Sequence, residues 1–265
     1  MSIENGKWNV EQYAKFINER TRPAVELLAR VNLSRVEQAV DLGCGPGNST
    51  ELLHARWSDS NIVGVDNSEE MLTAARRDYP QLTFQLADLS GWQAQAPLDL
   101  IFSNAVFQWV SDHRTLLPRL AKQLKAGGVL AMQMPHNHES PTHRSMREVA
   151  AENSFSVDLT AVRHEPPVLE PGAYYDVLLP HMSEIDIWET EYFHVLDSID
   201  AVLEWLKGTG LKPFLQPLPT DEQARFLARY KEKLTGFLKP QLDGKVLLPF
   251  PRLFVVARRR ESNFG

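Results

Sequence analysis

The chain has 265 residues, of which 43% are apolar and 23% charged. These proportions are typical of a soluble globular protein, and no apolar stretch approaches the ~20 residues that span a bilayer. The net charge of −6 argues against a nucleic-acid partner, and the first ten residues lack the apolar core of a signal peptide. The single cysteine, Cys44, excludes an internal disulfide, so a cytoplasmic location is expected.

The first predicted strand, residues 39–42, leads through a glycine-rich turn into a predicted helix over residues 48–56. The strand contains the acidic residue Asp41, and the turn contains Gly43, Gly45 and Gly47. The turn lacks the lysine of a phosphate-binding P-loop, and its G-x-G-x-G spacing differs from the G-x-G-x-x-G of dinucleotide-binding proteins. A nucleotide-binding turn of another class and a plain turn without a ligand both stay open.

A second predicted strand ends at Asp66, and a helix follows from Ser68. An acidic residue at this strand tip can accept two hydrogen bonds from the hydroxyls of a ribose. The alternative is that Asp66 caps the following helix, but Ser68 is better placed for that role. We therefore predict a ribose-binding role for Asp66 and include its neighbour Asn67 in the site.

Two more predicted strands, residues 82–86 and 98–103, end just before Asp88 and Asn104. The aromatic pair Phe107 and Trp109 follows the second of them, and each could be a core residue or a site residue. A helix over residues 112–124 that ends at a Gly-Gly pair and a strand over 129–134 come next. Strands that alternate with helices in this way predict a doubly wound, mostly parallel α/β sheet.

The second half of the chain contains a predicted strand over residues 184–195 with helices before and after it. A final strand contains Pro249 and Pro251, which favour a position at a sheet edge or a bulge. We predict one domain over residues 1–265. Its parts are an N-terminal helical lid (1–35), a cofactor-binding core (36–135), cap insertions around strand 184–195 (136–245) and a closing strand (246–258).

Three histidines form the cluster His136, His138 and His143. The spacing H-x-H-x₄-H could suggest a metal site, but no motif that combines a carboxylate with histidine accompanies it. We therefore expect no metal.

The glycine turn VDLGCGPG resembles the D/E-x-G-x-G-x-G loop of the class I S-adenosylmethionine-dependent methyltransferases. Further segments carry a resemblance of nearly the whole chain to one branch of that class, the trans-aconitate 2-methyltransferase family. These segments are RTRPAVELLARV, LDLIFSNAVFQW, GGVLAMQMP, THRSMREVA, AYYDVL, WLKGTGLKPFL and PFPRLFVVARR.

The resemblance implies a Rossmann-like seven-stranded sheet whose last strand is antiparallel, and S-adenosylmethionine as the cofactor. It implies that Asp88 accepts the adenine amine and the backbone N–H of Leu89 faces the ring, while Asn104 and Trp109 lie near the methionine part. The predicted cofactor site comprises Asp41, Gly43, Gly45, Gly47, Asp66, Asn67, Asp88, Leu89, Asn104 and Trp109.

The implied reaction is methyl transfer to a carboxylate of trans-aconitate, a small polycarboxylic acid, which gives a monomethyl ester. A carboxylate with a pKa of about 4 is already an anion at neutral pH, so no general base is expected. The other carboxylates of the acid need cationic partners, for which arginine is well suited. The candidates are Arg20, Arg22, Arg144, Arg147 and Arg252, with Tyr175 as a further donor.

Two alternatives stay open. Taken alone, the segments RTRPAVELLARV and VDLGCGPGNST would also suit the related malonyl-carrier-protein methyltransferase of biotin synthesis, whereas the later segments favour the aconitate branch. The chain could also be a protein that binds S-adenosylmethionine without catalysis.

Overall fold

The computed structural model describes residues 21–152, 154–162 and 168–261. The contacts between residues group the chain into two compact units. Unit 1 comprises Met1–Met134, Leu169–Glu189 and Leu253–Gly265, and unit 2 comprises Pro135–Val168 and Thr190–Arg252. The division into lid, core and cap made from the sequence stays a prediction.

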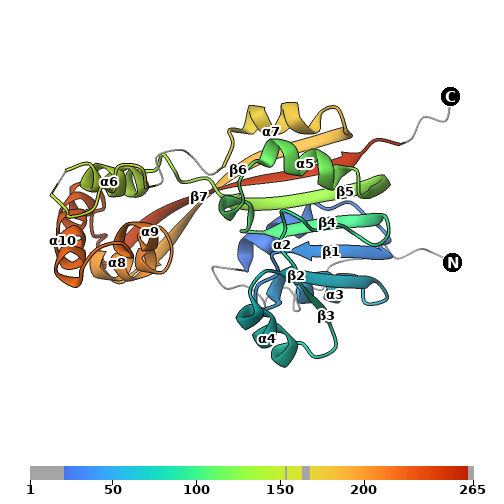
Figure 1. Ribbon diagram of the computed structural model, residues 1–265, viewed down its shortest axis with the longest axis horizontal. Coiled ribbons are helices and arrows are strands. Elements are labelled where there is room, and N and C mark those ends of the chain that lie inside the picture. Colours follow the sequence, from blue (N-terminus) through green and yellow to red (C-terminus); the bar gives the residue numbers. More distant parts are fainter. Residues whose placement is uncertain (1–20, 153, 163–167, 262–265) are drawn as a thin grey trace. The chain divides into compact units, whose positions relative to one another are not determined.

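A seven-stranded sheet forms the framework, in the order β3-β2-β1-β4-β5-β7-β6, and only β7 is antiparallel (Figure 1). The predicted fold class is therefore confirmed. The strands are β1 (Gln38–Leu42), β2 (Asn61–Asp66), β3 (Thr83–Leu86), β4 (Leu98–Asn104), β5 (Leu124–Pro135), β6 (Met182–Leu196) and β7 (Val246–Arg259).

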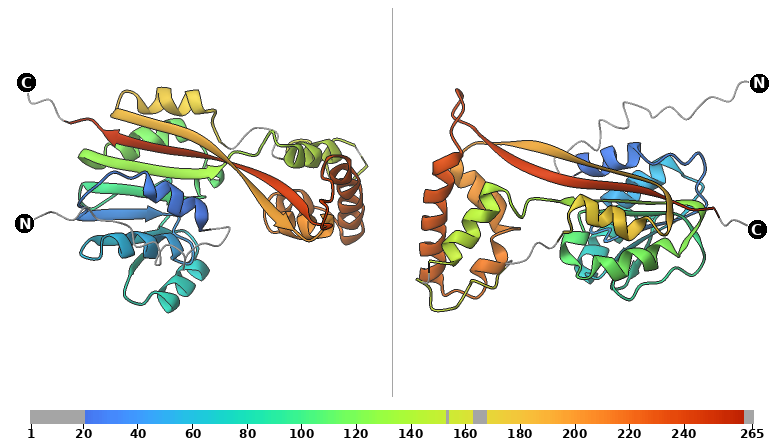
Figure 2. Two further views of the ribbon diagram at one scale, coloured as in Figure 1. Left: turned by 180° about the vertical axis from the view of Figure 1, so that it is seen from behind. Right: turned by 90° about the horizontal axis from the view of Figure 1, so that it is seen from above.

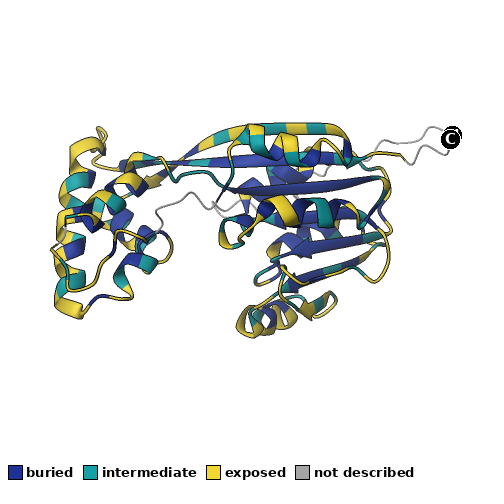
Figure 3. Cartoon of the chain, turned by 45° about the horizontal axis from the view of Figure 1, so that its top comes forward, coloured by how far each residue is buried: buried dark blue, intermediate teal, exposed yellow. Residues whose placement is uncertain are grey.

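The central strands β1 and β4 are buried along most of their length, as the dark blue ribbon of Figure 3 shows. Both are apolar on both faces, which is the pattern of a parallel strand covered by helices on each side. Leu42 pairs with Val65 of β2, and Asp41 pairs with Phe102 of β4. The carboxyl ends of β1, β2 and β4 therefore meet at one edge of the sheet, where ligands bind in folds of this kind.

The helices of unit 1 cover both faces of its sheet. Figure 2 shows α2 and α3 on one face and α5 and α7 on the other. Arg56 of α3 fixes α2, because its two Nη atoms donate to the carbonyls of Leu28 (2.5 Å) and Val31 (2.8 Å) at the helix end. The helices are α2 (Arg22–Ala29), α3 (Asn48–Arg56), α4 (Glu69–Asp78), α5 (His113–Ala121), α7 (Pro171–Leu178) and the 3₁₀ helix η1 (Phe107–Trp109).

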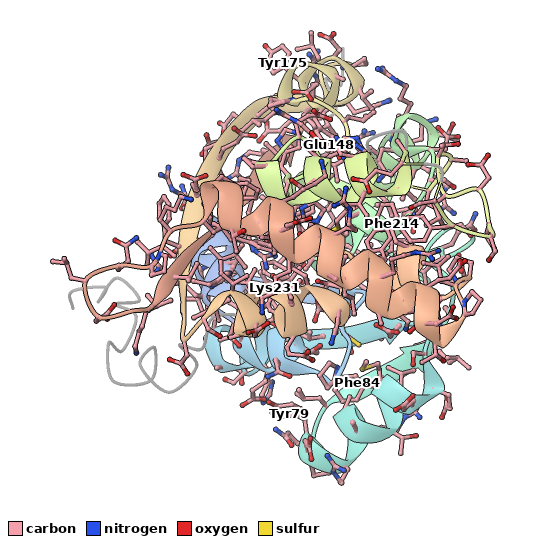
Figure 4. The ribbon with its side chains drawn as sticks, turned by 90° about the vertical axis from the view of Figure 1, so that its left-hand side faces the viewer. Tyr79, Phe84, Glu148, Tyr175, Phe214 and Lys231 are labelled. Carbon is pink, nitrogen blue, oxygen red and sulfur yellow. The ribbon has the colours of Figure 1, made fainter. Side chains whose placement is uncertain are left out.

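Unit 2 has a hydrophobic core of its own, built from one face of each of its longer helices. Phe226, Tyr230 and Leu234 of α10 are fully buried in it. At the surface Lys233 of α10 pairs with Glu148 of α6 at 2.9 Å, and Figure 4 labels Glu148 and Lys231 on these two helices. The helices are α6 (Pro141–Ala150), α8 (Ile199–Lys207), α9 (Lys212–Leu215) and α10 (Thr220–Phe237).

Two details of the predicted elements are wrong. The helix predicted over residues 112–124 ends at Ala121, and β5 already begins at Leu124, because a register shift between Leu98 and Leu100 of β4 accommodates residues 125–128 in the strand. Pro249 and Pro251 lie in β7, which stands between β5 and β6 in the strand order, so the predicted edge position is wrong, while the alternative of a bulge stays a prediction. The carbonyl of Pro251 instead accepts a hydrogen bond from the backbone N–H of His136 at 2.9 Å.

Candidate functional site

The glycine turn between β1 and α3 is fastened to the end of the neighbouring strand β2. The backbone N–H groups of Gly43 and Cys44 donate to the Val65 carbonyl at 2.7 and 3.0 Å. The φ angles of Gly43, Gly45 and Gly47 are +70°, +53° and +91°, in the left-handed region that glycine adopts without strain. The G-x-G-x-G spacing thus encodes a tight backbone path at the carboxyl edge of the sheet.

Asp41 lies beneath this turn and is fully buried. Its Oδ2 accepts hydrogen bonds from the hydroxyls of Ser49 (2.6 Å) and Thr50 (2.7 Å) in the first turn of α3. Burial raises the pKa of Asp41 to about 6, although the Ser49 and Thr50 hydrogen bonds act in the opposite direction. Asp41 therefore ties the end of β1 to the start of α3.

Asp41 is expected to make the stability of the protein fall between about pH 4 and pH 7. The folded state holds the Asp41 proton more tightly than the unfolded chain, whose pKa is 3.8. This stabilisation is complete below the unfolded pKa and is lost as the pH rises through the folded pKa. Urea unfolding of the wild type and Asp41→Asn across this range should show a difference in unfolding free energy that changes by roughly 2–3 kcal/mol. Parallel pH profiles for the two proteins would contradict the assignment.

Asp66, at the tip of β2, holds the glycine turn from the other side. Its Oδ2 accepts the Gly45 N–H and its Oδ1 accepts the Ser68 N–H, both at 2.9 Å. Each carboxylate oxygen has a further lone pair to offer, so the side chain keeps acceptor capacity toward a ligand. Ser68 is the N-cap of α4, since its side chain accepts from the Met71 N–H, as predicted.

Asp88 follows β3 and is connected to Asn67 at the end of β2. The Oδ1 of Asp88 accepts the Ser90 backbone N–H at 2.7 Å and also the Ser90 hydroxyl. These two bonds, and a weaker one from the Asn67 side chain, hold the pKa of Asp88 below its usual range. The carboxylate therefore stays ionised and oriented beside Leu89.

Asn104 ends β4 and begins the segment that carries Trp109. Its side-chain oxygen accepts a hydrogen bond from the amide of Gln133 on β5. The structure separates the aromatic pair whose roles the sequence left open: Phe107 is 0% exposed and lies in the core, whereas Trp109 is 62% exposed.

A pocket of about 870 Å³ lies at the carboxyl ends of β1, β2 and β4, entirely within unit 1. It brings together most of the predicted cofactor residues: Gly43, Gly45, Asp66, Asn67, Asp88, Leu89, Asn104 and Trp109. Asp41 and Gly47 are not in the lining. A Cβ at Gly47 would stand 2.9 Å from Tyr79 Cδ2 and 3.0 Å from Phe84 Cζ, two residues that Figure 4 labels beside α4. Asp41 and Gly47 therefore shape the glycine turn without lining the pocket.

The pocket also contains residues that sequence reasoning missed. Thr21 and Ala24 reach it from the start of α2, and Met71 reaches it from α4. Thr21 is 5% exposed, which is unusual for a threonine. None of these residues belongs to a motif that identifies a nucleotide site, so only the fold could reveal them.

The predicted substrate residues do not line this pocket, as far as the structure describes them. Arg20 lies outside the described residues. Arg22 is exposed, with its Nε 2.7 Å from Glu26 Oε1, and Tyr175 is 45% exposed on α7 (Figure 4).

Arg144, Arg147 and Arg252 belong to unit 2. Arg147 donates to the His138 carbonyl at 2.7 Å and Arg144 to the Glu139 carbonyl at 3.0 Å. Arg252 differs from both because it is only 9% exposed and its guanidinium carbon lies 5.0 Å from the centre of the Phe250 ring. Burial lowers the pKa of Arg252 to about 10, so it stays a cation at neutral pH. The roles of these arginines stay predictions.

Neither a metal site nor a membrane-spanning helix is found among the described residues. No group of three His, Cys, Asp or Glu side chains there could hold a metal ion, and this covers His136, His138 and His143. No described helix is both long and apolar enough to cross a membrane.

The strand order, the antiparallel β7 and a glycine-turn pocket with acidic residues after β2 and β3 define a class I S-adenosylmethionine-dependent methyltransferase. Residues 39–128 match the family described as a methyltransferase domain. The solved structure of the YcgJ protein from Bacillus subtilis has the same fold, with a TM-score of 0.59 at 14% identity, covering 91% of this chain and 100% of that one.

Curated relatives match along almost the full length. The trans-aconitate 2-methyltransferase of Azoarcus sp. (strain BH72) is 49% identical over 95% of this chain and 99% of its own. That of Methylobacterium nodulans is 51% identical over 95% of this chain and 98% of its own. The chain therefore belongs to the trans-aconitate 2-methyltransferase family, as the sequence motifs predicted.

Proposed function

We propose that the protein transfers a methyl group from S-adenosylmethionine to one carboxylate of trans-aconitate and releases the monomethyl ester. The observation that carries this proposal is the near-complete match to relatives of that name at about 50% identity. The substrate is assigned through those relatives, whereas the pocket supports the cofactor part of the proposal.

The donor and acceptor groups of the pocket fit S-adenosylmethionine. Asp66 keeps acceptor capacity for two ribose hydroxyls after binding the N–H groups of Gly45 and Ser68. Asp88 and the backbone of Leu89 offer an acceptor beside an N–H, which suits the amine and adjacent ring nitrogen of adenine. Gly45 leaves open space where a side chain would stand, so a ligand can approach the backbone.

Catalysis in this pocket is proposed to rest on positioning. When bound, S-adenosylmethionine supplies an activated methyl group on its sulfonium sulfur. The attacking carboxylate is an anion at neutral pH, so the chain needs to align it and exclude water rather than remove a proton. Asp66 and Asp88 would orient the nucleoside, and Asn104 and Trp109 would bound the methyl end of the pocket.

The test is an assay of the purified protein with S-adenosylmethionine and trans-aconitate, followed by mass spectrometry of the acid. We expect a monomethyl ester with trans-aconitate and much less with cis-aconitate or citrate. Ester formation on malonyl acyl carrier protein alone would replace the proposal with the carrier-protein reaction. Binding of S-adenosylhomocysteine by calorimetry without turnover of any of these acids would show a binding protein.

The arginine candidates can be tested in the same assay. Arg22→Ala and Arg252→Ala should each raise the apparent KM for trans-aconitate roughly 10–100-fold, because a carboxylate loses a charged donor. The affinity for S-adenosylhomocysteine should stay within about twofold. The matched control is Arg229→Ala on α10, an exposed arginine paired with Glu152. An unchanged KM in a variant that melts like the wild type would remove that arginine from the substrate site.

A further inference from the structure

The segment 105–112, which follows β4, has a strained backbone conformation at both ends, and contacts with other parts of the chain are needed to stabilise it. It contributes Ala105, Val106, Trp109, Val110 and Ser111 to the pocket. Ala105 (φ 59°) and Asp112 (φ 55°) stand at its two ends, and among the described residues they are the only non-glycine ones with positive φ. Such backbone conformations persist only where surrounding contacts over-determine them.

His113, the first residue of α5, supplies such contacts. It is only 4% exposed, and its Nε2 lies 2.9 Å from the carbonyl oxygen of Phe107. A carbonyl only accepts, so Nε2 carries the proton and donates. The same carbonyl also accepts the Val110 N–H at 3.0 Å, and the Phe107 ring lies edge-on to His113. His113 therefore fixes the middle of segment 105–112 through the carbonyl and the ring of Phe107.

Tyr174 of α7 fixes the other side of the His113 ring. Its hydroxyl lies 2.7 Å from Nδ1, and the two rings stack with their centres 5.8 Å apart. A neutral imidazole with its proton on Nε2 can only accept at Nδ1, so the Tyr174 hydroxyl donates there. The hydroxyl has one proton to donate, and Nδ1 at 2.7 Å is a nearer and stronger acceptor than Met134 Sδ of β5 at 3.4 Å. The hydroxyl oxygen in turn accepts a hydrogen bond from the Leu169 backbone. Tyr174 is fully buried, so this chain of contacts excludes water.

The environment favours a neutral His113. Burial lowers the pKa of His113, while its hydrogen bonds to the Phe107 and Val110 backbone and, to a smaller extent, the carboxylate of the N-cap Asp112 act in the opposite direction. The group that faces it from α7 is Tyr174, whose pKa burial raises, so its hydroxyl keeps its proton. Both imidazole nitrogens are engaged and His113 is not in the pocket lining, so it is not placed to act as a base on a substrate.

We propose that His113 and Tyr174 are positioning residues for methyl transfer: Tyr174 fixes His113 as the Nε2–H tautomer, and His113 holds segment 105–112 in the path that brings Trp109 to the pocket. The proposal rests on the proposed function for its kinetic part. Protonation of His113 would turn its Nδ1 from an acceptor into a donor and place a charge in a dry site. Methyl transfer should therefore fail as His113 becomes protonated at low pH.

The central test is Tyr174→Phe, which keeps the ring and removes the hydroxyl. A hydrogen bond to Nδ1 stabilises the neutral imidazole, so its loss should raise the His113 pKa and move the acid limb of kcat upward by roughly 0.5–1 pH unit. The affinity for S-adenosylhomocysteine at pH 7.5, measured by calorimetry, should fall about fivefold. The matched control is Tyr230→Phe, because Tyr230 is equally buried and its hydroxyl donates to the Thr142 carbonyl at 3.1 Å within unit 2. This variant should keep both the acid limb and the affinity.

A second variant separates positioning from packing. His113→Gln keeps an amide donor for the Phe107 carbonyl but does not titrate, so it should retain the affinity within about threefold and lose the acid limb. His113→Ala should lose about tenfold in affinity, since the buried carbonyl loses a donor.

Nitrogen-15 NMR of the wild type reads the tautomer directly and needs no turnover. A proton on Nδ1, or a Tyr174→Phe variant with the wild-type acid limb and affinity, would overturn the proposal. If the wild type forms no ester at all, the proposed function fails, while NMR and calorimetry still decide the role of His113.

Discussion

Replacing Asp66 with alanine is expected to raise the dissociation constant for S-adenosylhomocysteine by roughly 100-fold or more. Two hydrogen bonds from ribose hydroxyls to a charged acceptor contribute about 1.5–3 kcal/mol each, and both are lost together. The variant also removes the acceptor that holds the Gly45 and Ser68 N–H groups at 2.9 Å. The turn would then lose its anchor on β2 as well as its ligand contact.

Asp66→Asn is a milder change that keeps one acceptor oxygen and nearly the same shape. It loses the charge and leaves the N–H of Gly45 or Ser68 without its acceptor, so the affinity should fall about tenfold, less than in Asp66→Ala. The matched control is Asp78→Ala, an exposed carboxylate at the end of α4 that pairs with Arg77 and does not line the pocket. Isothermal calorimetry measures all three variants. An Asp66→Ala protein that binds S-adenosylhomocysteine like the wild type would refute the ribose-binding role.

Replacing Gly43 with alanine is expected to destabilise the protein by roughly 2–5 kcal/mol. A left-handed backbone costs a non-glycine residue about 1–2 kcal/mol, and overpacking adds about 1–3 kcal/mol. The overpacking arises because a Cβ on Gly43 would stand 2.1 Å from Val106 Cγ2. Val106 is β-branched and lines the pocket, so it cannot turn away without moving segment 105–112.

Gly45→Ala is the matched comparison, because Gly45 has the same kind of backbone (φ +53°) but open space around it. Gly45→Ala should lower the free energy of unfolding by only about 1–2 kcal/mol, because it has the cost of a left-handed backbone without overpacking. Urea unfolding of both variants checks the difference, and Val106→Ala in the Gly43→Ala background should recover the overpacking part. Equal losses for the two glycine variants would show that the close contact with Val106 does not matter.

Much of the cofactor site could be predicted because its signals are local. Two of these signals can be recognised from a short run of consecutive residues. One is a strand that ends in an acidic residue, as at Asp66, and the other is a turn with alternate glycines. Parallel strands then place these ends at one edge of the sheet, so the residues meet although 25 positions separate Asp41 from Asp66. The local sequence pattern and the sheet topology therefore both place the cofactor site at this edge.

Other assignments depended on packing that the local sequence does not contain. Nothing in the spacing distinguishes Phe107 from Trp109, yet one is buried against His113 and the other faces the pocket. Asp41 belongs to the glycine motif, but it is buried, accepts hydrogen bonds from two hydroxyls and supports the turn without lining the pocket. His113 carried no signal at all.

The sequence by itself determined the fold class, the family and the edge of the sheet at which the cofactor is proposed to bind. The fold class and the sheet edge follow from periodicity, from the glycine spacing and from polar residues at strand ends. The family follows from the resemblance of segments along nearly the whole chain to a known family. All of these signals lie within short runs of neighbouring residues. The tertiary structure alone decided which side chains line the pocket and which support it. Thr21 joins residues of β2 and β4 in the lining, and His113 meets Tyr174 across 61 positions. Burial and tautomer are properties of a packed environment, and that environment exists only once distant segments have come together.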